Sequence, residues 1–321
     1  MTTHSLSGRQ AQAGKYLQPS PALAEYVRRY EYFESDADDR VVQPMALSVF
    51  PVLMFYLAAR ATAFEYAVRR ARLVPTAIAL GPCDHRVADV SYQGRLMNFV
   101  VVFEPTGFSR LFHLSPGELR NYAHDGRDVL GAWITDLHSR LCEATRPEQM
   151  AEAVDEALLR KSSNALPKSP MQRAAASLLR YKARSNLASL ASSLGLSDSS
   201  WRRHFVSEIG VTPKRYLRML RFQHAVALKR ASPDRTWTEV CLDTGYYDQA
   251  HLIADFHDIG GASPSRFMRE LAVVPDAIAT AIYQSLADDH EVAVTGHSTN
   301  QAPHMFQSAT RRGVRLQAGG L

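Results

Sequence analysis

The clearest hydrophobic pattern in the chain lies between Leu187 and Phe205. The first apolar residues recur at spacings of three and four, which gives one buried helical face; they are Leu187, Leu190, Ala191 and Leu194. Gly195 follows, and glycine adopts the left-handed conformation needed just past a helix end without a Cβ clash. Ser197 is a favourable N-cap for a second helix that begins at Asp198. The pattern predicts two short helices joined by a glycine turn.

The second of these helices has a mixed surface. Trp201 and Phe205 fall on one side and are predicted to be core residues, whereas Ser199, Arg202 and Arg203 fall on other sides. Two short helices that leave arginines facing outward are typical of a DNA-reading helix-turn-helix.

The same unit returns further along the chain. Thr212 is expected to cap a long helix that Pro213 opens and that runs to about Ala231. Residues 236–239 (TWTE) then have the form of a capping box that opens another helix. Gly245 ends that helix, and Asp248 caps a second candidate recognition helix. Three residues recur 51 positions later, which is far more specific than one helix-turn-helix match: Phe205, Gly210 and Pro213 reappear as Phe256, Gly261 and Pro264.

The N-terminal part has a different pattern of hydrophobic residues. Residues 16–34 indicate an extended lead-in with a short helix. Across residues 41–104 the apolar runs are short, branched or aromatic and broken by proline or glycine, which predicts a small antiparallel barrel or jelly roll. Helices are expected afterwards: Ser115–Glu118 and Thr145–Glu148 have capping-box form, with the second opening Pro147–Arg160, and Val129–Cys142 has helical periodicity.

Periodicity stops at residues 161–170 (KSSNALPKSP), as in a linker. The predicted class is therefore α+β: a β-rich sensing or dimerisation domain, a linker and an all-α DNA-binding domain of two helix-turn-helix subdomains joined by a long helix. The predicted boundaries are 1–162, 163–170, 171–272 and, for a C-terminal extension, 273–321. Within the extension, residues 275–287 predict one amphipathic helix, and the polar residues 290–321 predict disorder.

Charge is concentrated in the region of the repeat. Residues 171–270 hold 15 Lys/Arg against 9 Asp/Glu, whereas the rest of the chain holds 22 against 23. A solvated basic face is the simpler explanation, but the coincidence with the helix-turn-helix pattern favours a phosphate-binding surface.

Several other classes are disfavoured. No apolar run approaches the roughly 20 residues of a membrane span, and the N-terminus lacks the apolar core of a signal peptide. Three scattered cysteines make neither a disulfide framework nor a zinc set. The histidines show no HxH or HxxxH pair. We therefore expect a cytoplasmic, non-enzymatic protein without membrane, metal or cofactor.

The repeat closely resembles the AraC/XylS family of transcription regulators. The resemblance covers about residues 171–270. The residues that carry it are G-L-S-x-x-x-W-x-R-x-F-x(4)-G-x-T-P-x-x-Y from Gly195 and G-Y-Y-D-Q-A-H-L-x(3)-F-x(4)-G-x-S-P-x-x-F from Gly245. The family implies two recognition helices in successive major-groove faces of one double-stranded DNA site.

The resemblance also implies the contact residues. It places Ser199, Ser200, Arg202, Arg203, Gln249 and His251 at base- or phosphate-contacting positions. Separately, the basic residues Arg215 and Arg218 of the long helix are expected to contact phosphates. Ala254 stands where the family usually has arginine, so the second reader is expected to be weaker than the first. RNA polymerase, a small-molecule effector and a second copy of the chain are the further partners that the family implies.

The N-terminal part is similar in outline to the strand-rich effector and dimerisation domains of such regulators. Residues 98–112, the SPGELR segment and residues 128–133 resemble one poorly characterised subgroup. The expected function is sequence-specific DNA binding under control of a small molecule. The alternative is a ligand-binding or protein-interaction protein whose DNA reader is degenerate.

Overall fold

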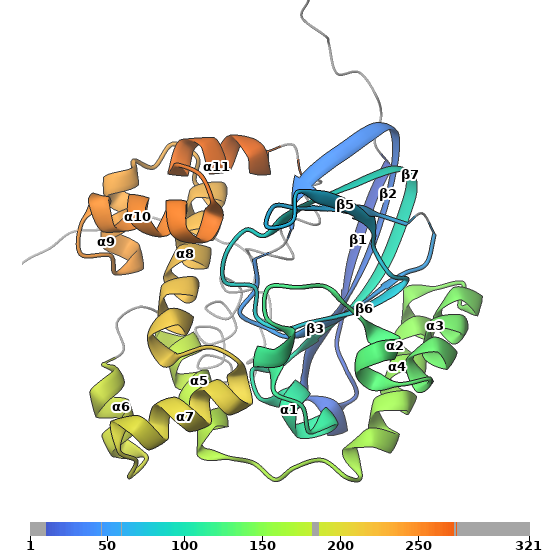
Figure 1. Cartoon of the computed structure of the whole chain (residues 1–321), viewed down its shortest axis with the longest axis horizontal. Coiled ribbons are helices and arrows are strands. Elements are labelled where there is room, and N and C mark those ends of the chain that lie inside the picture. Colours follow the sequence, from blue (N-terminus) through green and yellow to red (C-terminus); the bar gives the residue numbers. More distant parts are fainter. Residues whose placement is uncertain (1–10, 46, 59, 182–185, 273, 275–321) are drawn as a thin grey trace, which may run out of the picture.

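A computed structural model describes residues 11–45, 47–58, 60–181, 186–272 and 274 of the chain. An antiparallel sheet dominates the N-terminal part, and helices make up the C-terminal part (Figure 1). The strands are β1 (Ala11–Leu17), β2 (Val27–Pro44), β3 (Val52–Tyr56), β4 (Thr62–Glu65), β5 (Arg70–Leu73), β6 (Ala77–Leu80), β7 (Ala88–Phe103) and β8 (His124–Asp125). The expected α+β class is confirmed.

Two long strands form the spine of the sheet. The strand order is β1-β2-β7-β3-β6-β8, and β4 joins β5 to the first half of β7. The pairing of β2 with β7 shifts register between Val27 and Arg29 and again between Ala37 and Val41. Such bulges bend a strand and increase its twist. The long strand β7 pairs with β4 along its first half and with β3 along its second half.

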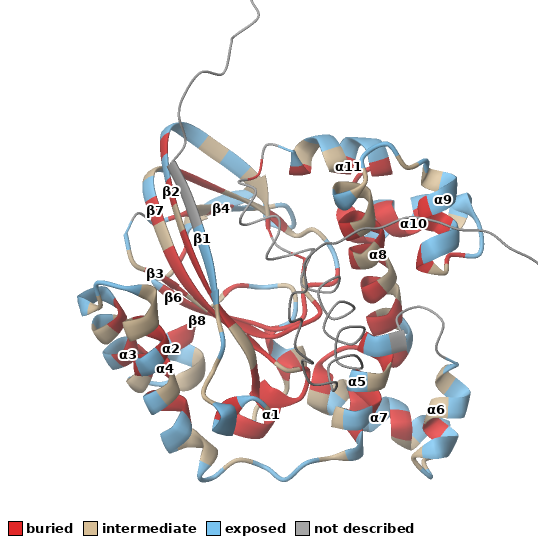
Figure 2. Cartoon of the chain, turned by 180° about the vertical axis from the view of Figure 1, so that it is seen from behind, coloured by how far each residue is buried: buried red, intermediate tan, exposed pale blue. Residues whose placement is uncertain are grey.

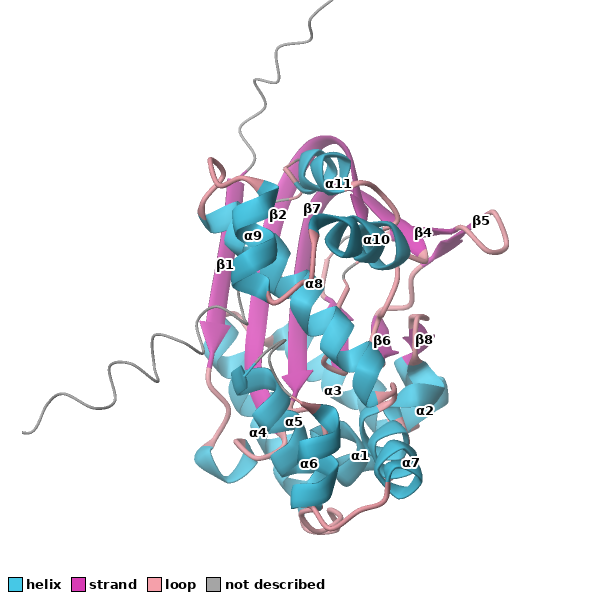
Figure 3. Cartoon of the chain, turned by 90° about the vertical axis from the view of Figure 1, so that its left-hand side faces the viewer, coloured by secondary structure: helices cyan, strands magenta, loops and turns pink. Residues whose placement is uncertain are grey.

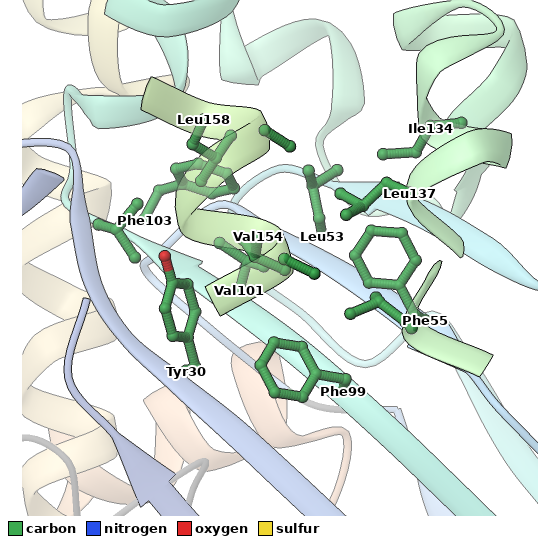
Figure 4. Close-up of a cluster of buried hydrophobic side chains, with 14 of the residues drawn as sticks. Tyr30, Leu53, Phe55, Phe99, Val101, Phe103, Ile134, Leu137, Val154 and Leu158 are labelled. Atoms are coloured by element: carbon green, nitrogen blue, oxygen red, sulfur yellow. The ribbon is translucent and has the colours of Figure 1, made fainter. Parts of the chain in front are cut away.

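Side chains alternate between the two faces of the sheet, because successive residues of a strand point to opposite sides. On one face Tyr30, Phe55, Phe99 and Val101 pack against Ile134, Leu137, Val154 and Leu158 of the neighbouring helices (Figure 4). On the other face Val52, Val100 and Val102 belong to a cluster that includes residues of the C-terminal helices.

The helices of the N-terminal part are α1 (Gly107–Phe112), α2 (Gly126–Leu130), α3 (Trp133–Glu143) and α4 (Pro147–Ser162), with 3-10 turns at Pro21–Leu23 and Pro116–Leu119. The single helix expected over residues 129–142 is two helices, since Gly131 at φ +83° breaks it. The 115–118 box caps only a 3-10 turn, through Ser115. In the 145–148 box the N-cap is Arg146, because Pro147 takes the first helical position.

The C-terminal helices follow the predicted repeat closely. They are α5 (Pro170–Tyr181), α6 (Leu187–Ser193), α7 (Asp198–Ile209), α8 (Pro213–Ala231), α9 (Trp237–Thr244), α10 (Gln249–Gly260) and α11 (Pro264–Leu271). In Figure 3 the cyan helices α8, α9 and α10 are drawn in front of the magenta sheet. The helix expected over residues 275–287 and the disorder expected over residues 290–321 lie outside the described residues.

The two parts of the chain share hydrophobic clusters. Phe33, Val52 and Val100 of the sheet belong to the same cluster as Trp201 and Phe205. A second cluster joins residues 45, 47, 83 and 88 to buried residues of α8, α9, α10 and α11. Figure 2 shows buried residues along the length of α8. Helix α4 ends at Ser162 and α5 begins at Pro170; the domain boundaries themselves remain predictions.

Candidate nucleic-acid interface

The first candidate reader is built by local capping. Gly195 adopts φ +67° after α6, and the hydroxyl of Ser197 accepts a hydrogen bond from the backbone N–H of Ser200 at 3.3 Å. Helix α7 then buries Trp201, Phe205 and Ile209. The predicted contact residues lie on its remaining surface, with Ser199, Arg202 and Arg203 exposed and Ser200 half-buried.

The second candidate reader repeats this construction. Gly245 adopts φ +76° after α9, and the carboxylate of Asp248 accepts from the backbone N–H of His251 at 2.7 Å. Helix α10 buries Leu252, Phe256 and Ile259. Gln249 and Ala254 are exposed and His251 is half-buried. The exposed methyl of Ala254 stands where α7 presents the guanidinium of Arg203.

The two arginines predicted on α8 already have acidic partners. Arg215 donates from Nε to Asp84 Oδ2 at 2.8 Å and is also paired with Asp258. Arg218 donates from Nη2 to Asp255 Oδ1 at 2.6 Å and to Asp258 Oδ2 at 2.8 Å. Side-chain exposures of 19% and 26% leave both guanidinium groups partly accessible. The structure therefore places Arg215 and Arg218 against acidic residues of α10.

These ion pairs change the electrostatics of the second reader. Burial acts to raise the pKa of Asp258, but Arg215 and Arg218 outweigh it and hold that pKa below its ordinary value. Burial acts in the same direction on Asp84, where His85, Asn121 and Arg215 lower the pKa. Asp258 is thus an ionised carboxylate with two cationic neighbours, which reduces the repulsion of DNA that its charge alone would cause.

Asp84 is a residue that local sequence patterns could not connect to this interface. It lies in the loop after β6, 131 positions before Arg215. Its neighbour Arg86 donates its backbone N–H to Ile259 O at 2.9 Å and pairs with Glu270 of α11. The N-terminal part therefore contacts α8, α10 and α11 directly.

A cavity lies on the sheet face that turns toward the C-terminal helices. Its volume is about 130 Å³ and its wall is mostly apolar, with contributions from β2, β3, β6 and β7. The wall includes Met45, Ser48 and Phe50. These three residues belong to the connection between β2 and β3. This connection also contacts α8, where Gln223 Nε2 donates to Leu47 O at 2.8 Å. One loop thus borders both the cavity and the helix that joins the two readers.

Among the described residues, no group of three or more His, Cys, Asp or Glu side chains is arranged to hold a metal ion. No described helix is both long and apolar enough to cross a membrane.

Comparisons with known proteins bear on both parts of the chain. Residues 190–270 match the family model of a helix-turn-helix domain, and residues 15–125 match a domain of unknown function, DUF6597. Among solved structures, ToxT from Vibrio cholerae O395 aligns at 8% identity over 81% of this chain and 97% of its own, with a TM-score of 0.42. The AraC-like transcriptional activator CuxR aligns at 12% identity over 69% of this chain and 86% of its own, with a TM-score of 0.23. No curated protein matches the chain.

The helix-turn-helix match ends at Glu270, close to the end of the repeat, and so covers both recognition helices and the helix between them. The repeat of caps, buried aromatic residues and left-handed glycines within that match is the pattern of a double DNA reader. Residues 190–270 form a helix-turn-helix domain of the AraC type, and the chain is a DNA-binding transcription regulator.

Proposed function

We propose that α7 supplies most of the base recognition and that α10 contributes attachment with weaker sequence preference. The observation that carries this proposal is the difference between equivalent positions of the two readers, where Arg203 and Ala254 are both exposed. An arginine can grip a guanine or bridge phosphates, whereas a methyl group can do neither. Base substitutions should therefore matter strongly in only one half of the site.

Arg215 and Arg218 are proposed as phosphate contacts of the connecting helix. Each would exchange part of its contact with a carboxylate for a phosphate oxygen as DNA approaches. Their partial exposure supports this role, and the ion pairs with Asp255 and Asp258 supply a second one, in holding α10 against α8. Ser199, Ser200, Arg202, Gln249 and His251 complete the proposed contact set.

The N-terminal domain, residues 1–162, is proposed to control this reader in response to a small molecule. The linker is proposed at residues 163–170, the DNA-binding domain at 171–272 and an extension of unassigned role at 273–321. The protein is proposed to act in the cytoplasm, by binding and without a catalytic step. Dimerisation and contact with RNA polymerase belong to the same proposal.

A salt titration tests DNA binding against the alternative of a degenerate reader. We expect the logarithm of the binding constant on random duplex DNA to fall linearly with the logarithm of salt concentration, with a slope of about −0.9 per phosphate neutralised. Fluorescence anisotropy of a labelled duplex measures it. Binding that is absent at low salt, or that does not change with salt, would favour the degenerate reader.

Replacement of Arg203 by alanine tests the assignment of the reading helix. If Arg203 contacts a base, Arg203→Ala should weaken binding to the preferred site by about 1 to 3 kcal/mol while changing random-DNA binding far less. The preferred site is first selected from a random library. Arg127→Ala is the matched control, because Arg127 is also exposed but lies on α2 of the N-terminal part. Equal losses on both DNAs would make Arg203 a phosphate contact, and unchanged affinity would remove it from the interface.

A further inference from the structure

The cavity on the sheet has an ordered arrangement of side chains. Three neighbouring strands contribute cross-strand rows to its wall, since Phe33 pairs with Asn98 and Asn98 pairs with Tyr56. Directly opposed residues of an antiparallel sheet have Cβ atoms about 4.5 to 5.5 Å apart. Asn98 therefore lies between two aromatic residues at the cavity wall.

The side-chain carbonyl oxygen of Asn98 lacks the hydrogen bond that a buried amide oxygen normally accepts. The exposed fraction of Asn98 is 6%, yet its carbonyl oxygen has no partner among the described residues. The adjacent Tyr56 is also buried, and its hydroxyl remains neutral because burial raises its pKa to about 12. A buried polar group without a partner is costly. A molecule that hydrogen-bonds to Asn98 would remove that cost.

The charges in the wall balance each other. Arg29 and Glu31 are the charged side chains that line the cavity, and they pair with each other. Arg29 donates to Glu31 Oε1 from Nε at 2.7 Å and from Nη2 at 2.6 Å. Burial raises the pKa of Glu31 above its ordinary value, although Arg29 acts to lower it. While Glu31 is ionised, a charged ligand would find no unmatched countercharge there and would lose its hydration. The wall is therefore suited to an uncharged ligand.

The size of the cavity limits the ligand further. Its volume of about 130 Å³ is comparable to that of an engineered cavity of about 150 Å³ that binds benzene. We propose that this cavity binds a small uncharged aromatic molecule with an O–H or N–H group, of the phenol or indole class, that hydrogen-bonds to Asn98 and packs its ring beside Phe33 and Tyr56.

Binding at this position has a direct route to the DNA reader. Met45, Ser48 and Phe50 border the cavity, and Leu47 in the same loop accepts the hydrogen bond from Gln223 on α8. A ligand that moves this loop would change how α8 packs against the N-terminal part. The role of the ligand as an effector rests on the proposed function, whereas its binding to the cavity does not.

A panel of small ligands tests the proposal on the purified full-length protein. Calorimetry and thermal unfolding are followed with phenol, indole, toluene, benzoate and benzylammonium. We expect phenol and indole to bind and to raise the unfolding temperature, toluene to bind about tenfold more weakly than phenol, and the two ions not to bind. Benzoate or benzylammonium binding as tightly as phenol, or toluene equalling phenol, would overturn the proposal.

Two variants locate the binding site. Asn98→Leu should lower phenol affinity about tenfold and leave toluene affinity unchanged. Met54→Leu is the control, since Met54 lines the same cavity without offering a strong hydrogen-bond group; it should preserve the ratio of phenol to toluene affinity. A ratio unaltered in Asn98→Leu would overturn the assignment. If that variant does not fold, the wild-type panel alone decides.

DNA binding of the same preparation separates the two proposals. Salt-dependent binding to duplex DNA together with no response to phenol or indole would overturn the cavity assignment and leave the reader intact. Phenol binding without DNA binding would overturn the proposed DNA reader and leave the cavity assignment intact.

Discussion

Replacement of Gly210 by alanine is expected to lower the free energy of unfolding by about 2 to 5 kcal/mol. Gly210 adopts φ +93° at the end of α7, where an L-residue costs roughly 1 to 2 kcal/mol. An added Cβ would also lie 2.6 Å from Gly117 N and 2.9 Å from Pro116 C, both backbone atoms of the N-terminal part. Because neither atom belongs to a flexible side chain, α7 and this turn must move apart, at a cost of about 1 to 3 kcal/mol.

The second repeat supplies a matched control. Gly261 holds the equivalent position at φ +71°, but an added Cβ there meets only side-chain atoms of Arg86, the nearest at 3.4 Å. Gly261→Ala should therefore cost only the backbone strain, roughly 1 to 2 kcal/mol. Urea unfolding of both full-length variants measures the difference. Equal losses in the two variants would show that α7 and the turn at Gly117 can move apart without a cost in free energy.

The sequence predicted the helices of the DNA reader well because their ends are determined locally. Thr212 caps α8 through the backbone N–H of Arg215, and Pro213 follows at the first helical position. Thr236 and Glu239 close the predicted capping box of α9. Each of these contacts spans three residues, so a local sequence pattern contains all of the information. The same holds for the left-handed glycines at 195, 210, 245 and 261.

For the N-terminal part, the sequence predicts only the fold class. Short branched and aromatic runs indicated strands, but the pairing of β2 with β7 depends on bulges at residues 27–29 and 37–41, which no local pattern marked. The broken helix at Gly131 was missed for a related reason. Trp133, Ile134 and Leu137 continue the helical period, and periodicity alone does not show that a glycine at positive φ separates two helices.

The site was predictable in its exposed residues and not in its long-range contacts. The spacing of Arg202 and Arg203 from Trp201 and Phe205 was sufficient to place them on the surface, as the structure does. The sequence also predicts a phosphate contact from Arg215. Its pairing with Asp84, 131 positions away, exists only because the loop after β6 lies against α8. Asn98 likewise acquires its place in a cavity wall through strand pairing.

Replacement of Arg218 by methionine is also expected to lower the free energy of unfolding strongly. Asp255 is 1% exposed and accepts two hydrogen bonds from Arg218, from Nε at 2.9 Å and from Nη2 at 2.6 Å. Removal of one partner of a buried ion pair leaves a buried charge uncompensated and costs about 3 to 5 kcal/mol. We expect about 3 kcal/mol, at the lower end of that range, because a quarter of the Arg218 side chain is exposed.

A double variant separates the charge from the packing. Arg218→Met combined with Asp255→Leu removes both charges and keeps apolar volume, so its unfolding free energy should lie within about 1 kcal/mol of the wild type. Urea unfolding of the two single variants and the double variant completes the cycle. Additive losses in the double variant would show that the ion pair is not what stabilises the contact between α8 and α10.

The same double variant tests the second role proposed for Arg218. If Arg218 contacts a phosphate when DNA binds, the stably folded double variant should bind both random and preferred DNA more weakly, with the salt slope reduced by about one unit. The Asp255→Leu single variant should keep the wild-type slope, because its Arg218 remains. A folded double variant with the wild-type slope would leave Arg218 as a residue that holds α10 in place and does not touch DNA.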